Sequence, residues 1–211
     1  FGDEAWGRLP AAVPAAAMAL GGLLHYLYET QKTDLSYIND LDYYEQGRFM
    51  ELDLTARRNL ELTQTLRGQE KKGSLLWVLD RTQTPMGGRC LRSWLERPLL
   101  SVTAICRRNA AVAALVDDTL GREELIAALA GLGDMERLIS RIVYGTAGGR
   151  DLSALRAAIE KLPEIKVRLA AFPDRRLAEL SEELDGLEDL GKRIAETICD
   201  EPPLSVREGD L

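Results

Sequence analysis

The order of apolar and polar positions along the chain predicts a protein built almost entirely of helices. Apolar residues recur every three or four positions through most of the sequence, which is the spacing that gives a helix one buried face. Residues between Phe49 and Leu52 could form at most a short strand, within an otherwise extended passage over 33–53. The predicted fold class is therefore all-α. The helices are expected over 11–30, 54–67, 75–79, 85–96, 102–116, 125–130, 135–143, 151–171 and 175–198.

The last two of these helices are expected to be long and antiparallel. Over 175–198 the apolar residues form a near-heptad stripe from Leu177 to Ile194, which is typical of core packing or a coiled-coil-like seam. Pro163 is expected at most to kink the helix over 151–171, because proline lacks the N–H that an interior helical position donates. The pattern predicts a multihelical bundle with long arms.

The segment 73–99 predicts a helical hairpin with a tight turn. Ser74 and Thr84 stand where helices begin, and an N-cap hydroxyl accepts a hydrogen bond from an otherwise unpaired backbone N–H. Pro85 suits the first helical position, where its missing N–H is not needed. Because residues 75–79 are apolar nearly all round, the first helix of the hairpin is expected to be buried.

The composition is typical of a helical, cytoplasmic protein. No run of about 18 uninterrupted apolar residues occurs, so no membrane span is expected. The apolar run 11–27 lacks a preceding basic region, so a signal peptide is not expected either. Cys90, Cys106 and Cys199 stand in helical patterns and are expected to be buried, reduced thiols. His25 has no Cys or acidic pair at ligand spacing, so no metal site is expected.

Charge divides the chain into acidic ends and a basic centre. The whole chain carries a net charge of −7, yet residues 51–110 hold eleven basic side chains against six acidic ones. Surfaces that bind nucleic-acid phosphates are usually basic, so this central basic segment is the candidate DNA surface. Solvated helix faces with salt bridges to acidic neighbours are the commoner interpretation. The basic residues are Arg57, Arg58, Arg67, Lys71, Lys72, Arg81, Arg89, Arg92, Arg97, Arg107 and Arg108.

The sequence contains no recognisable set of catalytic residues. No G-x-x-x-x-G-K-[ST] phosphate loop occurs, and no Ser-His-Asp set or Cys-His pair can be placed. The paired carboxylates Glu123-Glu124 and Glu182-Glu183 are adjacent in sequence, so they lie on different faces of a helix. We expect no catalytic, cofactor-binding or metal-binding residue in this chain.

Four segments of the chain carry distinctive motifs: FMELDLTARRNLEL at 49–62, GSLLWVLDRTQTPMGGRCLRSWLERPL at 73–99, GDMERLISRIVYGTAGGRDLSALRAAI at 133–159 and DEPPLSVREGDL at 200–211. These segments resemble the MutS family of DNA mismatch-repair proteins. They follow the family's order over nearly the whole chain and are similar to its core and lever domain, domain III. The family also carries a mismatch-reading Phe-x-Glu motif, and Phe49-Met50-Glu51 matches its letters. Because this match lies where the core domain begins, that role is not assigned to it.

The resemblance implies a non-catalytic piece of a larger ATPase. ATP and Mg would bind in a domain that this sequence does not contain, and the core and lever domain would couple closure of the DNA clamp to that ATPase domain. The implied partners are the connector, clamp and ATPase domains, a second copy in a homodimer on mismatched duplex DNA, and a MutL-type protein. The expected organisation is a connector-to-core segment (1–53), a helical core (54–145) and lever helices leading towards the clamp (146–211).

Two other functions remain open from the residues themselves. A stand-alone helical module could bind a partner protein along the stripe between Leu177 and Ile194. Alternatively, the basic segment 57–108 could bind the DNA backbone directly, with steep salt dependence. No DNA-binding residue is assigned in this chain.

Overall fold

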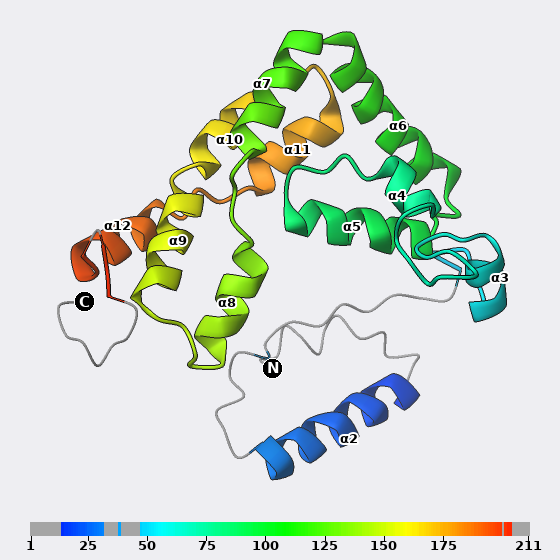
Figure 1. Ribbon diagram of the computed structural model, residues 1–211, viewed down its shortest axis with the longest axis horizontal. Helices are drawn as coiled ribbons and strands as arrows, with labels where there is room; N and C mark the ends of the chain where they lie inside the picture. The colour runs from blue at the N-terminus through cyan, green and yellow to red at the C-terminus, as the bar shows by residue number, and fades with distance from the viewer. Residues whose placement is uncertain (1–13, 32–37, 39–46, 200, 204–211) are drawn as a thin grey trace. The chain divides into compact units, whose positions relative to one another are not determined.

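The protein, described here from a computed structural model, consists of helices joined by loops (Figure 1). The structure describes residues 14–31, 38, 47–199 and 201–203. The helices are α2 (Pro14–Gln31), α3 (Leu54–Asn59), α4 (Leu75–Leu79), α5 (Pro85–Glu96), α6 (Val102–Asp117), α7 (Thr119–Leu129), α8 (Met135–Val143), α9 (Gly149–Ile159), α10 (Leu162–Ala170), α11 (Arg175–Glu183) and α12 (Glu188–Thr197).

The all-α fold class is confirmed. Among the described residues, β-type pairing is limited to an isolated antiparallel bridge between Phe49 and Leu99. Two backbone hydrogen bonds flank it, from Met50 N to the Pro98 oxygen at 2.7 Å and from Leu100 N to the Arg48 oxygen at 3.4 Å. The short strand considered at residues 49–52 is therefore a single bridge that joins the start of the second unit to the loop after α5.

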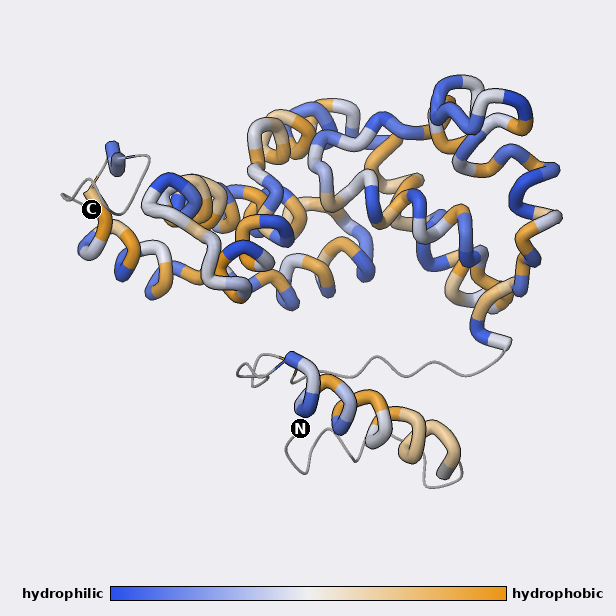
Figure 2. The backbone as a smooth tube through the Cα atoms, turned by 60° about the horizontal axis from the view of Figure 1, so that its bottom comes forward, coloured by the Kyte–Doolittle hydropathy of each residue, from blue (hydrophilic) through white to orange (hydrophobic). Residues whose placement is uncertain are grey.

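The chain divides into two compact units, residues 1–46 and 47–211. In the first unit the structure describes α2, whose predicted start at residue 11 lies outside the described residues, as does most of the extended passage 33–53. Hydrophilic residues gather towards the C-terminal end of α2, where His25 Nε2 lies 3.4 Å from Glu29 Oε1 (Figure 2). The predicted boundaries 1–53, 54–145 and 146–211 stay a prediction.

The core of the second unit consists of two clusters that meet at α9. The larger cluster joins side chains of α6, α7, α9, α10 and α11, and the smaller joins α9 and α12, with partly buried residues of α8 packed against it. A Cβ atom placed on Gly191 of α12 would lie 3.1 Å from Ile159 Cγ2, so the glycine permits close packing of α12 on α9. The larger cluster contains Ala111, Leu125, Ala128, Leu132, Ala158, Leu162, Ile165, Phe172 and Leu177, and the smaller contains Leu155, Ile159 and Ile194.

The predicted long helix over 151–171 is wrong. It is two helices, α9 and α10, with a break at Glu160 and Lys161. Pro163 is the second residue of α10 and has no N–H to donate to the carbonyl of Ile159, so a continuous helix would lose a hydrogen bond there. The break is held by tertiary contact, because Lys161 Nζ donates to the Ala130 oxygen at 2.9 Å.

The second long helix is also interrupted. Helix α11 ends at Glu183, and α12 begins after Leu187, whose φ of 49° is left-handed. The Asp185-Gly186 pair favours a turn, and Asp185 Oδ1 accepts a hydrogen bond from Leu187 N at 3.0 Å. Lys166 Nζ of α10 donates to the Leu184 oxygen at 2.8 Å, which holds the chain where the first helix ends. The predicted heptad seam therefore does not exist as one stripe.

Two other helix boundaries differ from the prediction. Helix α3 ends at Asn59 rather than near residue 67, and Glu61 takes a left-handed φ of 47°. The carbonyls of Glu61 and Leu62 accept hydrogen bonds from the backbone N–H groups of Leu75 and Leu76, at 3.0 and 2.8 Å. Helix α7 begins six residues earlier than predicted, where the Asp118 carboxylate accepts a hydrogen bond from Gly121 N at 2.9 Å.

The predicted caps of the hairpin are confirmed, but its predicted burial is wrong. Ser74 Oγ accepts from Trp77 N at 3.2 Å, and Thr84 Oγ1 accepts from Gly87 N at 3.0 Å. Of α4, however, only Leu76 is buried; the exposed apolar side chains are Leu75, Trp77, Val78 and Leu79. A helix of five residues that is apolar all round cannot cover all its faces with one neighbouring helix.

Replacing Ser74 with alanine should destabilise the second unit by about 2 kcal/mol, because it removes a helix cap and a buried hydrogen bond together. The Ser74 side chain is fully buried and also donates to the Lys71 oxygen at 2.7 Å. Ser101→Ala is the matched control: Ser101 caps α6 from an exposed position, and its loss should cost about 0.5 to 1 kcal/mol. Urea unfolding of both variants measures the difference, and equal losses would contradict it.

Candidate functional site

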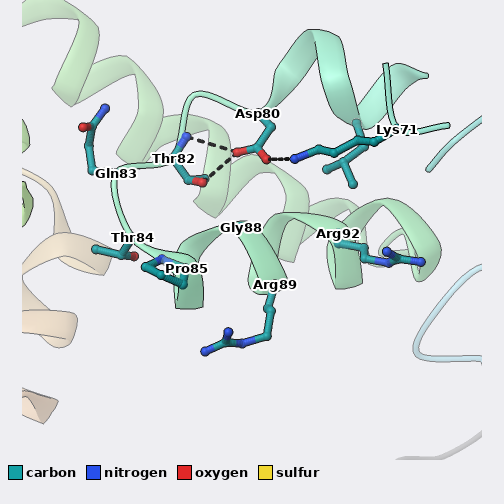
Figure 3. Close-up of a pocket in the computed structure, with 10 residues that line it drawn as sticks. Lys71, Asp80, Thr82, Gln83, Thr84, Pro85, Gly88, Arg89 and Arg92 are labelled. Carbon is teal, nitrogen blue, oxygen red and sulfur yellow. Dashed lines mark hydrogen bonds and ion pairs between the residues drawn. The ribbon is translucent and has the colours of Figure 1, made fainter. Parts of the chain in front are cut away.

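A pocket of about 610 Å³ opens at the turn of the hairpin, between α4 and α5 (Figure 3). Figure 3 shows that the Lys71 and Thr82 side chains both reach Asp80, while those of Arg89 and Arg92 extend away from this group. One side of the pocket is thus closed by the hydrogen-bonded cluster of Lys71, Asp80 and Thr82, and the other side is bordered by the two arginines. Its lining residues are Lys71, Leu76, Asp80, Thr82, Gln83, Thr84, Pro85, Gly88, Arg89 and Arg92.

Asp80 is the centre of the bonded cluster. Its Oδ2 accepts from Lys71 Nζ at 2.6 Å, and its Oδ1 accepts from the hydroxyl of Thr82 at 2.7 Å and from its backbone N–H at 3.3 Å. The Lys71 ammonium and then the two Thr82 donors lower the pKa of Asp80 to about 2. Because Asp80 is also the C-cap residue of α4, these bonds fix the turn between the two helices of the hairpin.

Arg89 ties the hairpin to α8. Its two terminal nitrogens donate to both carboxylate oxygens of Asp134, at 2.9 and 2.6 Å, and its Nε donates to Glu136 Oε2 at 2.7 Å. These carboxylates raise the pKa of Arg89 above its ordinary value, and Arg89 lowers the pKa of Asp134. Asp134 is also the N-cap of α8, since its Oδ1 accepts a hydrogen bond from Arg137 N at 3.2 Å.

The cations of the central basic segment are distributed over several pockets. Lys71, Arg89 and Arg92 line the hairpin pocket, whereas Arg57 and Arg58 line a separate pocket of about 330 Å³ beside α3. Several of these cations are paired with carboxylates: Lys71 with Asp80, Arg89 with Asp134 and Glu136, Arg92 with Glu96, and Arg107 with Glu179.

A third pocket, of about 430 Å³, brings together arginines from distant parts of the chain. Arg107 and Arg108 of α6 meet Arg48, from the first residues of the second unit, and Arg176 of α11. The guanidinium carbon of Arg108 lies 3.7 Å from the centre of the Trp94 ring, a cation–π contact. Sequence reasoning missed Arg48 and Arg176 because both lie outside the basic segment, and no local pattern links them to it.

The prediction of buried cysteines is wrong, because Cys90, Cys106 and Cys199 are all exposed. Cys90 lies on α5, Cys106 on α6 and Cys199 just after α12, each on a side that neighbouring elements leave open to solvent. Trp94 of α5 is likewise 46% exposed and lies against Arg108.

The described residues bring no three His, Cys, Asp or Glu side chains together in an arrangement that could hold a metal ion. Within the same residues, no helix is long and apolar enough to span a membrane. Phe49, the first letter of the Phe-x-Glu match, is engaged in the bridge to Leu99, with Arg48 over its ring at 5.3 Å.

Comparison with known proteins decides the family. The sequence profile described as MutS domain III matches residues 55–211, which include the hairpin, α6 and every later helix. The chain belongs to the MutS domain III family. Curated relatives named DNA mismatch repair protein MutS are 47% identical in Desulforamulus reducens, over 94% of this chain, and 48% identical in Alkaliphilus oremlandii, over 92%. The one from Listeria monocytogenes is 42% identical over 92% of the chain.

The chain spans less than a quarter of the length of these relatives, since the matches cover 22 to 23% of each. In this MutS domain III chain, the hairpin pocket and the Arg89 link to α8 lie wholly within the matched residues. Arg48 alone among the arginines of the third pocket lies before the match begins.

Replacing Lys71 with methionine should raise the pKa of Asp80 from about 2 towards its ordinary value of 3.8, because the largest stabilising partner of the carboxylate is lost. Since the folded-state pKa lies below the ordinary value, Asp80 stabilises the fold above about pH 4, and this stabilisation is lost as the pH falls towards 2. NMR titration of the Asp80 side-chain carboxyl carbon in the parent chain and the variant measures the pKa change. Lys72→Met is the control, and an equal shift in that variant would contradict the assignment.

Proposed function

We propose that this chain is the non-catalytic core and lever domain of a MutS-type mismatch-repair ATPase. The observation that carries the proposal is the match to MutS domain III over residues 55–211, with relatives that are named DNA mismatch repair proteins. The domain couples closure of a DNA clamp to a distant ATPase domain, where ATP and Mg bind. The proposal places it in a cytoplasmic homodimer that acts on mismatched duplex DNA with a MutL-type protein.

The exposed apolar side chains of α4 support contact with further domains. Leu75, Val78 and Leu79 are spaced to share one face of this short helix, and they and Trp77 are all exposed. Contiguous apolar surface of this kind marks an interaction site on a folded protein. Because the chain spans less than a quarter of its relatives' length, the connector, clamp and ATPase domains are the natural partners for such a surface.

The packing within the second unit offers a route for mechanical coupling. Packed, physically contiguous elements that have two arrangements can carry coupling between distant sites. The Arg89 guanidinium joins α5 to α8, α8 packs on α9, and α9 packs on α12. Short, mutually packed helices therefore take the place of the long arms that the sequence predicted, and each junction between them is a point where the helices can shift.

The structure favours neither alternative function, the partner-binding module or the DNA-binding surface. A partner-binding stripe between Leu177 and Ile194 would need one continuous exposed apolar face. Both of these end residues are buried, and the exposed Leu180 and Leu190 lie on two separate helices, α11 and α12. A DNA surface along 57–108 would need cations that are free to meet phosphates, but several of them are paired with carboxylates, and they are distributed over three pockets. The lever function is favoured over both.

In fluorescence anisotropy at low and moderate salt, this chain should not bind matched or mismatched duplex DNA. The reason is that its net charge is −7 and its central cations are dispersed and paired. Salt-sensitive binding that is lost in an Arg57→Gln, Arg58→Gln double variant would instead establish the basic segment as a DNA surface. A preference for mismatched duplex would overturn the assignment of mismatch reading to another domain.

In a full-length MutS-type protein carrying this domain, Arg89→Ala should reduce the stimulation of ATP hydrolysis by mismatched DNA about threefold while leaving the unstimulated rate unchanged. A residue on a coupling route changes the coupling free energy by roughly 0.5 to 2 kcal/mol. Arg67→Ala, an exposed change outside the helices of this route, is the control. A parallel fall in both rates would mean that Arg89 only stabilises the fold, and no effect would remove it from the route.

A further inference from the structure

The arginine-lined pocket beside α6, described above, is not explained by the lever function. It is lined by Gly47, Arg48, Leu99, Ser101, Thr103, Ala104, Arg107, Arg108 and Arg176, so no Asp or Glu among the described residues lines it. At about 430 Å³ it is within the size range of small-ligand pockets. Guanidinium groups that converge on a cavity without lining carboxylates form a site for an anion.

The surrounding structure holds these arginines in place. The bridge between Phe49 and Leu99, with the hydrogen bond from Leu100 N to the Arg48 oxygen, fixes the backbone of Arg48 at the pocket. Helix α11 packs on α6, and Glu179 of α11 pairs with Arg107, which positions Arg176 opposite the start of α6. Stacking on the Trp94 ring fixes the Arg108 guanidinium. The pocket is therefore preorganised, which reduces the entropy lost on binding.

The positive charge of the pocket is only partly balanced. Glu179 pairs with Arg107 and lies 3.4 Å from Arg176, and Glu183 lies 3.5 Å from Arg176. Two carboxylates therefore stand against four guanidinium groups, and among the described residues Arg48 and Arg108 have no carboxylate partner. Burial first, and also the charge of Arg176, lower the pKa of Arg108, as expected for a cation that lacks its counter-ion.

The unbalanced charge selects the type of anion. A phosphate monoester carries a charge of about −1.5 to −2 at pH 7 and has three acceptor oxygens, whereas a DNA phosphodiester or a single carboxylate carries one charge. Arginine also binds phosphate through paired hydrogen bonds, and the hydroxyls of Ser101 and Thr103 supply further polar groups. A long duplex would bring many phosphates against a chain of net charge −7, which a small ligand avoids.

We propose that this pocket binds the phosphate group of a small phosphate monoester. The site is separate from the proposed coupling route. A result against this proposal would therefore leave the lever function untouched, and a result against the lever function would leave this proposal untouched. Trp94 provides a reporter, since a ligand that bonds to Arg108 changes the environment of the ring on which Arg108 stacks.

Titration of the 211-residue chain with glycerol 3-phosphate, followed by the indole N–H resonance of Trp94 and by calorimetry, tests the proposal. We expect one saturable site, no response to glycerol, and weaker binding below about pH 6, where the phosphate loses its second charge. Arg48→Gln and Arg176→Gln should each weaken binding about tenfold, the effect of removing a charged hydrogen bond. Arg193→Gln, the same change on exposed α12, should leave binding unchanged.

Several results would overturn the proposal. One is the absence of a saturable response to glycerol 3-phosphate. A second is binding of dimethyl phosphate, or of a DNA duplex without terminal phosphates, as tight as that of glycerol 3-phosphate. Such binding would show that the pocket accepts a phosphodiester. A third is equally tight binding of a glutamate-rich peptide, which would make an acidic protein segment the occupant. A fourth is unchanged affinity in Arg48→Gln, a variant of an exposed side chain.

Discussion

Helix α9 must be buried on two neighbouring faces at once, and the arrangement of the second unit follows from this. Leu155, Ala158 and Ile159 are each only 2% exposed. Leu155 and Ile159 belong to the smaller cluster, against α12 and α8, whereas Ala158 belongs to the larger cluster with α7, α10 and α11. Apolar side chains at such spacing form two stripes, and each stripe requires its own set of helices to exclude water.

This requirement explains why the C-terminal half consists of short helices. A single helix running on from α9 would carry its apolar stripe out of both clusters, whereas the break before Leu162 returns the chain to the larger one. Similarly, the left-handed Leu187 separates α11, which packs on α10, from α12, which packs on α9. Gly191 then allows α12 to approach Ile159 closely.

Charged side chains add further links between helices that pack against the larger apolar cluster. Arg89 bridges from α5 to the first turn of α8, and Glu179 joins α11 to α6. Exposed ion pairs of this kind contribute little stability individually. Their effect is to set how the helices are oriented relative to one another. This suits a domain whose proposed task is to transmit movement between neighbouring domains. The same convergence of α6 and α11 leaves arginines without full charge balance, which is how a structural domain acquires an anion pocket.

The sequence by itself determined the features that depend on near neighbours in the chain. The caps at Ser74, Thr84 and Asp134 are bonds between residues three apart, so their residue types and positions suffice to predict them. The all-α class follows from helical spacing, and the family from motifs preserved in order.

Only the tertiary structure decided where the long helices break, which apolar residues of the hairpin stay exposed, and which distant charges meet. Arg89 and Asp134 are 45 residues apart, and Arg48 reaches its pocket through a bridge to Leu99. Such contacts depend on how elements pack against one another. The free energy that selects one packing comes from many residues together, so no single residue or local pattern predicts it.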